Sequence, residues 1–113
     1  MKTIERVRAL LPVGATIVCV ENTYIPRHNG TTRRLTAGGV GWRECEILTG
    51  QDAGKRGFRM NLPTRARDVL AIGDRSVTYR IAPGRDETVT LEVLSRGAAD
   101  PATDKVAAAA GTA

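Results

Sequence analysis

Short runs of alternating apolar and polar residues recur along this chain, and the clearest two lie near its C-terminal end. Every second side chain is apolar in 76–81 and again in 88–94. An alternation of period two is typical of a strand that buries one face and exposes the other. Between the two runs lies Pro83-Gly84-Arg85-Asp86, which is typical of a hairpin loop. The pattern therefore predicts an antiparallel β-hairpin over 76–94.

Four earlier segments are also expected to form strands, because each combines apolar or β-branched residues with flanking turn residues. They are 15–20, 33–37, 42–49 and 57–62. Within 42–49 the alternation places Cys45 and Ile47 on one face and Glu44 and Glu46 on the other. The segment 64–70 is expected to form a single helical or 3-10 turn. These elements predict a small antiparallel barrel or half-barrel of five or six strands.

The two ends of the chain differ from this β pattern. Residues 3–11 carry apolar side chains at helical spacing and predict a short helix, with Thr3 as its cap and Pro12 after it. Residues 97–113 are rich in alanine and nearly lack large apolar side chains, so we expect a disordered tail. The sequence thus predicts one mainly β domain over 1–96.

The opening of SH3-like barrels, including KOW-type modules, is similar to Val13-Gly14-Ala15-Thr16-Ile17-Val18-Cys19-Val20, the loop to Gly30, and Arg33-Arg34-Leu35. In those folds a Gly-x-x-Val-x-Val strand is followed by a long loop and a glycine before the second strand. The resemblance implies an SH3-like small barrel. The wider sequence VENTYIPRHNGTTRRL … NLPTRARDVL resembles short uncharacterised proteins of actinobacteria and their phages, which implies a genomic setting and no activity.

Positive charge is concentrated in one part of the chain. Residues 27–67 hold nine Lys and Arg against three Asp and Glu, a net charge of +6, whereas the whole chain carries +5. A basic segment within a nearly neutral chain is typical of a protein that binds phosphate groups. An arginine-rich, alanine-rich composition also arises from a GC-rich genome without any selection for binding. Both explanations remain open from the sequence.

The loop 22–34 and the segment after it contain the candidate binding residues. An aromatic ring offers a stacking face to a base, and an arginine offers contacts to phosphate. The ring candidates are Tyr24 and Trp42, for which packing at a barrel end is the competing explanation. The arginine candidates are Arg27, Arg33, Arg34, Arg59, Arg65 and Arg67. If the strands carrying Arg33, Arg34 and Arg59 lie side by side, these arginines form one basic stripe.

Catalytic, cofactor and metal motifs are lacking in the sequence. His28 is the single histidine, and no serine or cysteine in a known nucleophile motif accompanies it. A zinc site of Cys19, Cys45 and His28 lacks a fourth ligand and the close pairing of zinc motifs. We expect both cysteines to be buried and free. The sequence therefore predicts a protein that is no enzyme and holds no cofactor and no metal.

The first hypothesis is a non-enzymatic small barrel that binds DNA or RNA through the basic patch in 27–67. One alternative is a protein-interaction module that binds a host protein of a phage or a second copy of itself. The other is a small nucleotide- or anion-binding protein with a pocket at Arg33, Arg34 and Arg59. Because the sequence lacks a membrane-length apolar stretch and a secretory signal, we expect a cytoplasmic location and no membrane partner.

Overall fold

The computed structural model describes residues 1–97, so the predicted tail, 97–113, lies outside the described residues apart from Gly97. Within 1–97 the chain forms one α-helix, seven β-strands and two short 3-10 helices. In chain order these are α1 (Thr3–Leu10), β1 (Thr16–Asn22), η1 (Pro26–His28), β2 (Thr32–Gly38), β3 (Trp42–Ile47), β4 (Phe58–Asn61), η2 (Ala66–Asp68), β5 (Val69–Ile72), β6 (Ser76–Arg80) and β7 (Thr88–Ser95).

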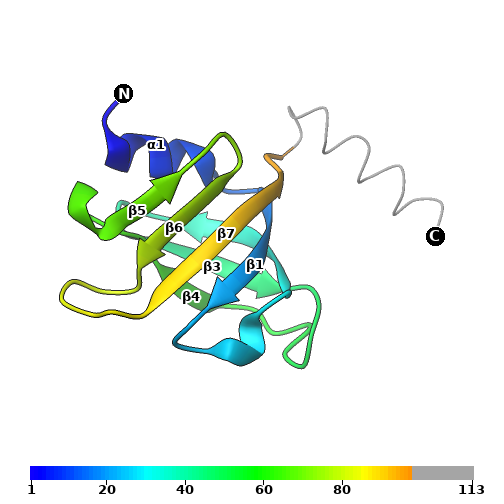
Figure 1. The fold of residues 1–113 in the computed structure, drawn as a ribbon. Helices are drawn as coiled ribbons and strands as arrows, with labels where there is room; N and C mark the ends of the chain where they lie inside the picture. The colour runs from blue at the N-terminus through cyan, green and yellow to red at the C-terminus, as the bar shows by residue number, and fades with distance from the viewer. Residues whose placement is uncertain (98–113) are drawn as a thin grey trace.

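All seven strands belong to one antiparallel sheet with the order β4-β3-β2-β1-β7-β6-β5. Figure 1 shows this sheet bent over itself, with β5, β6 and β7 in front and β3 and β4 behind them. The bend passes through β1, whose ladder with β7 shifts register between Thr16 and Ile17 and between Cys19 and Glu21. Such bulges bend a strand and increase its twist.

The mainly β domain with an N-terminal helix is confirmed, but the expected number of five or six strands is wrong, and the seven-stranded sheet is not closed as a barrel. The additional strand is β5, which follows η2 directly in the segment expected to form only a helical turn. A register shift between Val69 and Ala71 disrupts its alternation, and so the sequence pattern did not reveal a strand. The sheet remains open because no ladder joins its two edge strands, β4 and β5, each of only four residues.

The core lies between the two layers and consists of inward-facing residues of every second position. Ile17, Cys19, Leu35, Cys45 and Leu91 are almost completely buried there. The predicted burial of both cysteines is therefore confirmed, and both are free thiols.

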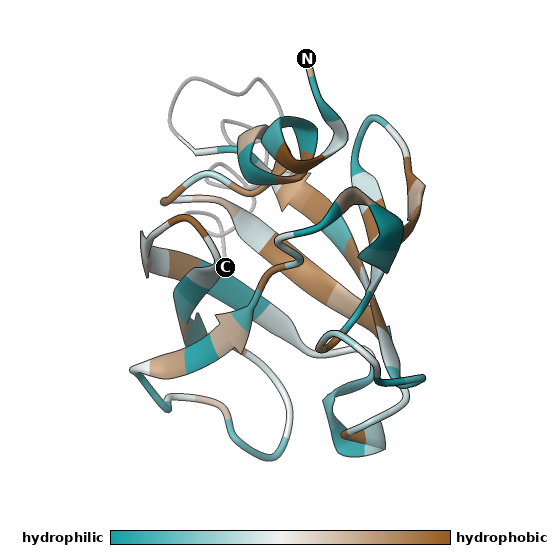
Figure 2. Cartoon of the chain, turned by 90° about the vertical axis from the view of Figure 1, so that its left-hand side faces the viewer, coloured by the Kyte–Doolittle hydropathy of each residue, from teal (hydrophilic) through white to brown (hydrophobic). Residues whose placement is uncertain are grey.

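Helix α1 lies across one end of the two layers (Figure 2), where Val7, Leu10 and Leu11 are buried. Its cap is Lys2 rather than Thr3, and the Lys2 backbone N–H donates to the Glu5 carboxylate at 3.3 Å. No helix of residues 1–97 has the length and the apolar character to cross a membrane.

A buried arginine fastens α1 to the sheet. Arg43 on β3 is only 6% exposed, and its Nε donates to the Leu11 carbonyl at 2.7 Å. Its Nη1 donates to the carbonyls of Gly39 (2.6 Å) and Trp42 (2.7 Å), and its Nη2 to the carbonyl of Arg8 (3.4 Å). The last carbonyls of a helix lack partners within the helix and carry partial negative charge. The Arg43 guanidinium therefore satisfies this end of α1.

Candidate functional site

The open sheet leaves a seam where β4 and the end of β6 face each other without a shared ladder. The Tyr79 hydroxyl donates across it to the carbonyl of Asn61 at 2.9 Å. Both residues line a hollow of about 240 Å³, here called the seam pocket. Its apolar lining includes Ile25, Phe58, Met60, Ile81 and Val89, and its three arginines are Arg33, Arg59 and Arg85.

Arg33 reaches the seam pocket from inside the sheet. The alternation of β2 turns it inward, so that it is only 2% exposed. Its Nη2 lies 3.0 Å from Nδ1 of His28, and its Nη1 lies 3.8 Å from the thioether sulfur of Met60. The guanidinium carbon lies 4.8 Å from the centre of the Phe58 ring. Its Nε is buried and finds no hydrogen-bond partner among the described residues.

No carboxylate of residues 1–97 lies within 4.0 Å of the Arg33 guanidinium. The acidic groups of the interior do not compensate the charge either. Burial raises the pKa of the Cys19 thiol, raises that of Cys45 to about 11 and raises that of the Tyr79 phenol. All three groups are therefore neutral at pH 7. A buried charge without a paired anion is costly, which makes Arg33 an unusual feature of this core.

His28 links Arg33 to the nearest acidic side chain. Burial, followed by the charges of Arg33 and Arg27, lowers the pKa of His28, so its imidazole is neutral at pH 7. A neutral imidazole can accept from Arg33 through Nδ1. Its Nε2 lies 3.8 Å from the carboxylate of Asp52, which also pairs with Lys55 at 2.9 Å. Asp52 thus lies on the side of the imidazole away from Arg33, and its carboxylate already pairs with Lys55 and Arg27.

Two arginines of the seam pocket lie over aromatic rings, of which Tyr24 lines the pocket and Trp42 lies outside its lining. The guanidinium of Arg59 lies 4.2 Å from the centre of the Trp42 ring, and that of Arg85 lies 5.5 Å from the centre of the Tyr24 ring. Tyr24 is 56% exposed. Arg85 also pairs with Glu87 at 2.7 Å, and this hydrogen bond lowers the pKa of Glu87 to about 2. An anion that binds Arg85 must therefore compete with Glu87.

Two further hollows continue the seam pocket along the same side of the molecule. The first shares Asn61 and Ile81 with it, and the second shares Arg85. We call the three together the seam groove. Among its lining residues are six arginines and two carboxylates, those of Asp68 and Asp86. The arginines are Arg33, Arg59, Arg65, Arg67, Arg80 and Arg85.

The arginines of the seam groove differ in how they are paired. Arg80 lies 3.6 Å from the carboxylate of Asp68. Arg59, Arg65 and Arg67 are exposed, and within residues 1–97 no carboxylate comes within 4.0 Å of any of them.

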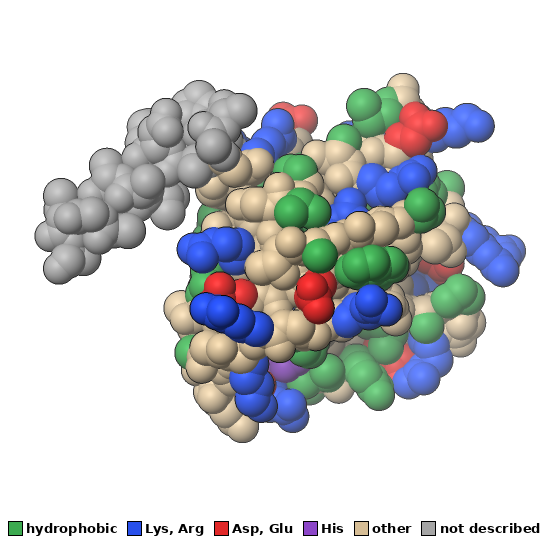
Figure 3. Space-filling model, turned by 180° about the vertical axis from the view of Figure 1, so that it is seen from behind, with side chains coloured by type: hydrophobic (Ala, Val, Ile, Leu, Met, Phe, Trp, Pro, Cys, Tyr) green, Lys and Arg blue, Asp and Glu red, His purple; other side chains and the backbone are tan. Residues whose placement is uncertain are grey.

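The other predicted arginines lie away from the groove and are paired. Arg27 lies 3.5 Å from the Asp52 carboxylate, and Arg34 lies 3.7 Å from that of Glu46, which Arg56 also approaches at 3.6 Å. Figure 3 shows acidic side chains among the basic ones on the face opposite to that of Figure 1. The condition for the predicted basic stripe is not met, because β3 lies between β2 and β4. Arg33 and Arg34 also point to opposite faces of β2, so the predicted pocket at Arg33, Arg34 and Arg59 lacks Arg34.

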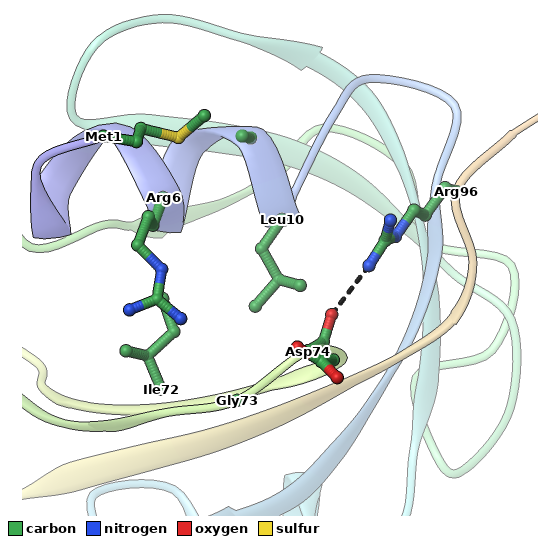
Figure 4. Close-up of a pocket in the computed structure, with 8 residues that line it drawn as sticks. Met1, Arg6, Leu10, Ile72, Gly73, Asp74 and Arg96 are labelled. Atoms are coloured by element: carbon green, nitrogen blue, oxygen red, sulfur yellow. Dashed lines mark hydrogen bonds between the residues drawn. The ribbon is translucent and has the colours of Figure 1, made fainter.

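A separate hollow of about 220 Å³ lies between α1 and the β5–β6 turn (Figure 4). Arg6 points from α1 toward Ile72, and Arg96 donates to the Asp74 carbonyl at 2.7 Å. Its lining contains no aromatic ring, and Asp74 contributes a carboxylate next to its arginines. This hollow therefore suits a nucleotide less well than the seam pocket does.

Several residues of the groove were missed from the sequence. Arg80 and Arg85 lie outside the basic segment 27–67, and Tyr79 and Asn61 appeared only as strand residues. The hairpin loop gave one usable signal, because Arg85 stands in a four-residue turn where a side chain is exposed. These residues come together only because the end of β6 lies opposite β4 across the seam.

Among the described residues, no cluster of three His, Cys, Asp or Glu side chains is placed to hold a metal ion. Comparison with family models, with curated proteins and with solved structures finds no match for this chain. The geometry and the charge of the seam groove are therefore the features that indicate a function.

Proposed function

We propose that this chain binds single-stranded nucleic acid along the seam groove. The observation that supports it is the excess of six arginines over two carboxylates in three adjoining hollows. A groove with such an excess attracts a chain of phosphates, and the attraction dominates affinity for nucleic acids. The exposed ring of Tyr24 in the groove and the partly exposed ring of Trp42 next to Arg59 favour unpaired bases, whose faces are free to stack.

The exposed arginines of the groove have different roles in this proposal. Arg65 and Arg67 stand at the far end of the groove, where they meet phosphates without giving up a carboxylate partner. Arg59 and Arg85 each lie over a ring, so that a base and a phosphate are bound within one nucleotide of each other. Arg27 and Arg34, which pair with Asp52 and Glu46, contribute little to this proposal.

Fluorescence anisotropy with a labelled oligonucleotide, over a range of salt concentrations, tests the proposal. The double variant Arg65→Gln/Arg67→Gln is compared with Arg34→Gln/Arg56→Gln, which removes the same charge at two residues that do not line the groove. We expect the groove variant to lose about tenfold in affinity at low salt. The slope of log affinity against log salt falls in magnitude by about 1.4, since each lost phosphate contact contributes about 0.7 for a single strand.

The control variant should keep the wild-type slope and lose less than about threefold in affinity, an effect of overall charge alone. Equal losses in the two variants contradict the groove as the binding surface. If the wild-type protein does not bind the oligonucleotide at low salt, the proposed function is wrong. Tighter binding of a duplex than of a single strand contradicts the role of the rings.

A further inference from the structure

We propose that the seam pocket binds a nucleotide through its phosphate monoester, with the phosphate at Arg33 and the nucleoside against the apolar wall. The monoester is either the terminal phosphate of a strand or a free nucleoside monophosphate. The inference rests on the proposed function only in the first case.

Arg33 is the feature that calls for an anion. It is buried, it lines the pocket, and its guanidinium meets a neutral imidazole, a thioether and a ring rather than a carboxylate. A guanidinium carries five N–H donors. The contacts to His28 and Met60 occupy two of them, and a thioether is a weak acceptor. A phosphate oxygen would provide the missing negative charge and strong hydrogen bonds together.

Met60, which contacts Arg33 and also lines the pocket, is a side chain that moves easily. Met60 is unbranched with several rotatable bonds, and such a side chain repacks at low cost. Its replacement by a phosphate oxygen would exchange a contact of 3.8 Å for a charge-assisted hydrogen bond. The occupied pocket therefore requires no change in the sheet.

The size and the walls of the pocket indicate what is attached to the phosphate. The volume of about 240 Å³ lies below the range of about 300–1,000 Å³ for small-molecule pockets, so the pocket suits a ligand no larger than roughly one nucleotide. Ile25, Phe58 and Val89 give one wall an apolar surface. Asn61 and Asn22 also line the pocket. Oδ1 of Asn22 already accepts from the backbone N–H groups of Tyr24 and Ile25, which leaves its amide N–H groups to donate to a base or a sugar.

The depth of Arg33 favours a monoester over an internal diester. An internal diester carries two substituents, so the nucleic-acid chain on both sides of the phosphate would have to leave the pocket through the seam between β4 and β6. A monoester carries one, so that it reaches a side chain only 2% exposed with its remaining oxygens forward. Arg59 and Arg85 at the rim then neutralise the second charge of the monoester.

The first test uses the wild-type protein and three strands of one sequence at one salt concentration. One strand has a 5′-phosphate, one a 3′-phosphate and one neither. We expect one phosphorylated end to raise affinity about tenfold or more, as a hydrogen-bonded charged group does, and the other end to raise it far less. Similar small gains from both ends reflect overall charge and overturn the inference. Binding that ignores both phosphates overturns it and leaves the proposed function intact.

The second test measures thermal stabilisation by nucleoside monophosphates, by the matching nucleosides and by inorganic phosphate. Monophosphates should raise Tm at concentrations where nucleosides and inorganic phosphate do not. This result without any strand binding supports the pocket and contradicts the proposed function. Stabilisation by inorganic phosphate equal to that by the nucleotides overturns the assignment of a nucleotide.

Variants connect these results to Arg33. Arg33→Gln should abolish the preference for the phosphorylated end, and Arg33→Lys should restore only part of it, because lysine lacks the planar fork. Arg34→Gln is the matched control on the same strand and should keep the full preference. A preference that survives in folded Arg33→Gln overturns the role of Arg33. If Arg33→Gln does not fold, the wild-type strand comparison alone decides.

Discussion

Arg33 and Arg43 are two buried arginines on neighbouring strands, and they are satisfied in opposite ways. Arg43 donates to four backbone carbonyls at the end of α1 and at the β2–β3 turn. Arg33 meets a neutral imidazole and a thioether, and its Nε has no partner among the described residues. Arg43 completes the fold, whereas Arg33 costs stability unless an anion joins it. A buried arginine is thus structural or functional according to what its donors find.

The largest effect is expected from the removal of Arg43. Arg43→Met keeps the bulk of the side chain but leaves the carbonyls of Leu11 and Gly39 without their donor, while that of Trp42 keeps the Gly39 N–H at 3.1 Å. A buried polar group that loses its partner costs about 1–3 kcal/mol, so we expect a loss of about 3 kcal/mol in the free energy of unfolding. Urea denaturation measures it. A loss below about 1 kcal/mol would show that Arg43 is no more essential than Arg33.

Arg33→Met is the counterpart and breaks the comparison if it behaves like Arg43→Met. It removes an uncompensated buried charge, and replacement of such charges by apolar side chains is often neutral or stabilising. We expect the free energy of unfolding to change by less than about 1 kcal/mol or to rise, since only His28 loses a partner. The same variant should bind phosphorylated and unphosphorylated strands equally well. A large loss of stability with unchanged strand binding would make Arg33 structural.

The sequence already contained part of this difference. The alternation that placed Cys45 and Ile47 inward also places Arg43 inward, and the same period sets Arg33 beside Leu35. The hairpin over 76–94 and the short helix were predictable, because their periodic patterns are long and unbroken. The strand β5 was not, because a bulge interrupts its four residues.

The seam groove itself was beyond local patterns. It joins Tyr24, Arg59 and Arg67 to Arg85, and these residues meet only because the sheet bends at β1 and stays open between β4 and β6. Charge counted along the chain assigned the basic patch to 27–67. In space the acidic residues Asp52 and Glu46 lie next to some of these arginines and leave others unpaired. Pairing, which depends on strand order, decides which positive charges are free.

The imidazole beside Arg33 predicts a pH dependence of moderate size. Burial and the nearby arginines lower the pKa of His28 below the 6.5 of the unfolded chain, while Asp52 acts in the opposite direction. The unfolded state therefore binds a proton that the folded state rejects as the pH falls below about 6.5, and the fold loses stability there. We expect a loss of up to about 1.4 kcal/mol for each pH unit between pH 6.5 and the folded pKa.

Urea denaturation at several pH values from 7 to 5 measures this loss. His28→Gln is the control, because an amide oxygen can accept from Arg33 but does not titrate in this range. The lowered pKa values of Asp52 and Glu87 act at more acidic pH, below the unfolded values of 3.8 and 4.5, so they do not interfere. An unchanged pH dependence in His28→Gln would exclude the imidazole as its source.

The smallest effect on stability is expected for the contact between Arg59 and Trp42, which combines a structural and a binding role in one exposed arginine. Arg59 lies over Trp42 and is exposed, and a cation–π contact at an exposed site is worth about 0.5–1 kcal/mol. Trp42→Leu removes the ring and should lower the free energy of unfolding by about that amount. If the ring also stacks on a base, affinity for a single strand falls further, by about 1–3 kcal/mol, as for other stacking platforms.

Arg59→Gln, which removes the cation but leaves the ring, should lower the salt slope while keeping most of the stacking. Equal behaviour of Trp42→Leu and Arg59→Gln in binding would mean that the ring serves only to position the guanidinium, as the carbonyls around Arg43 position theirs.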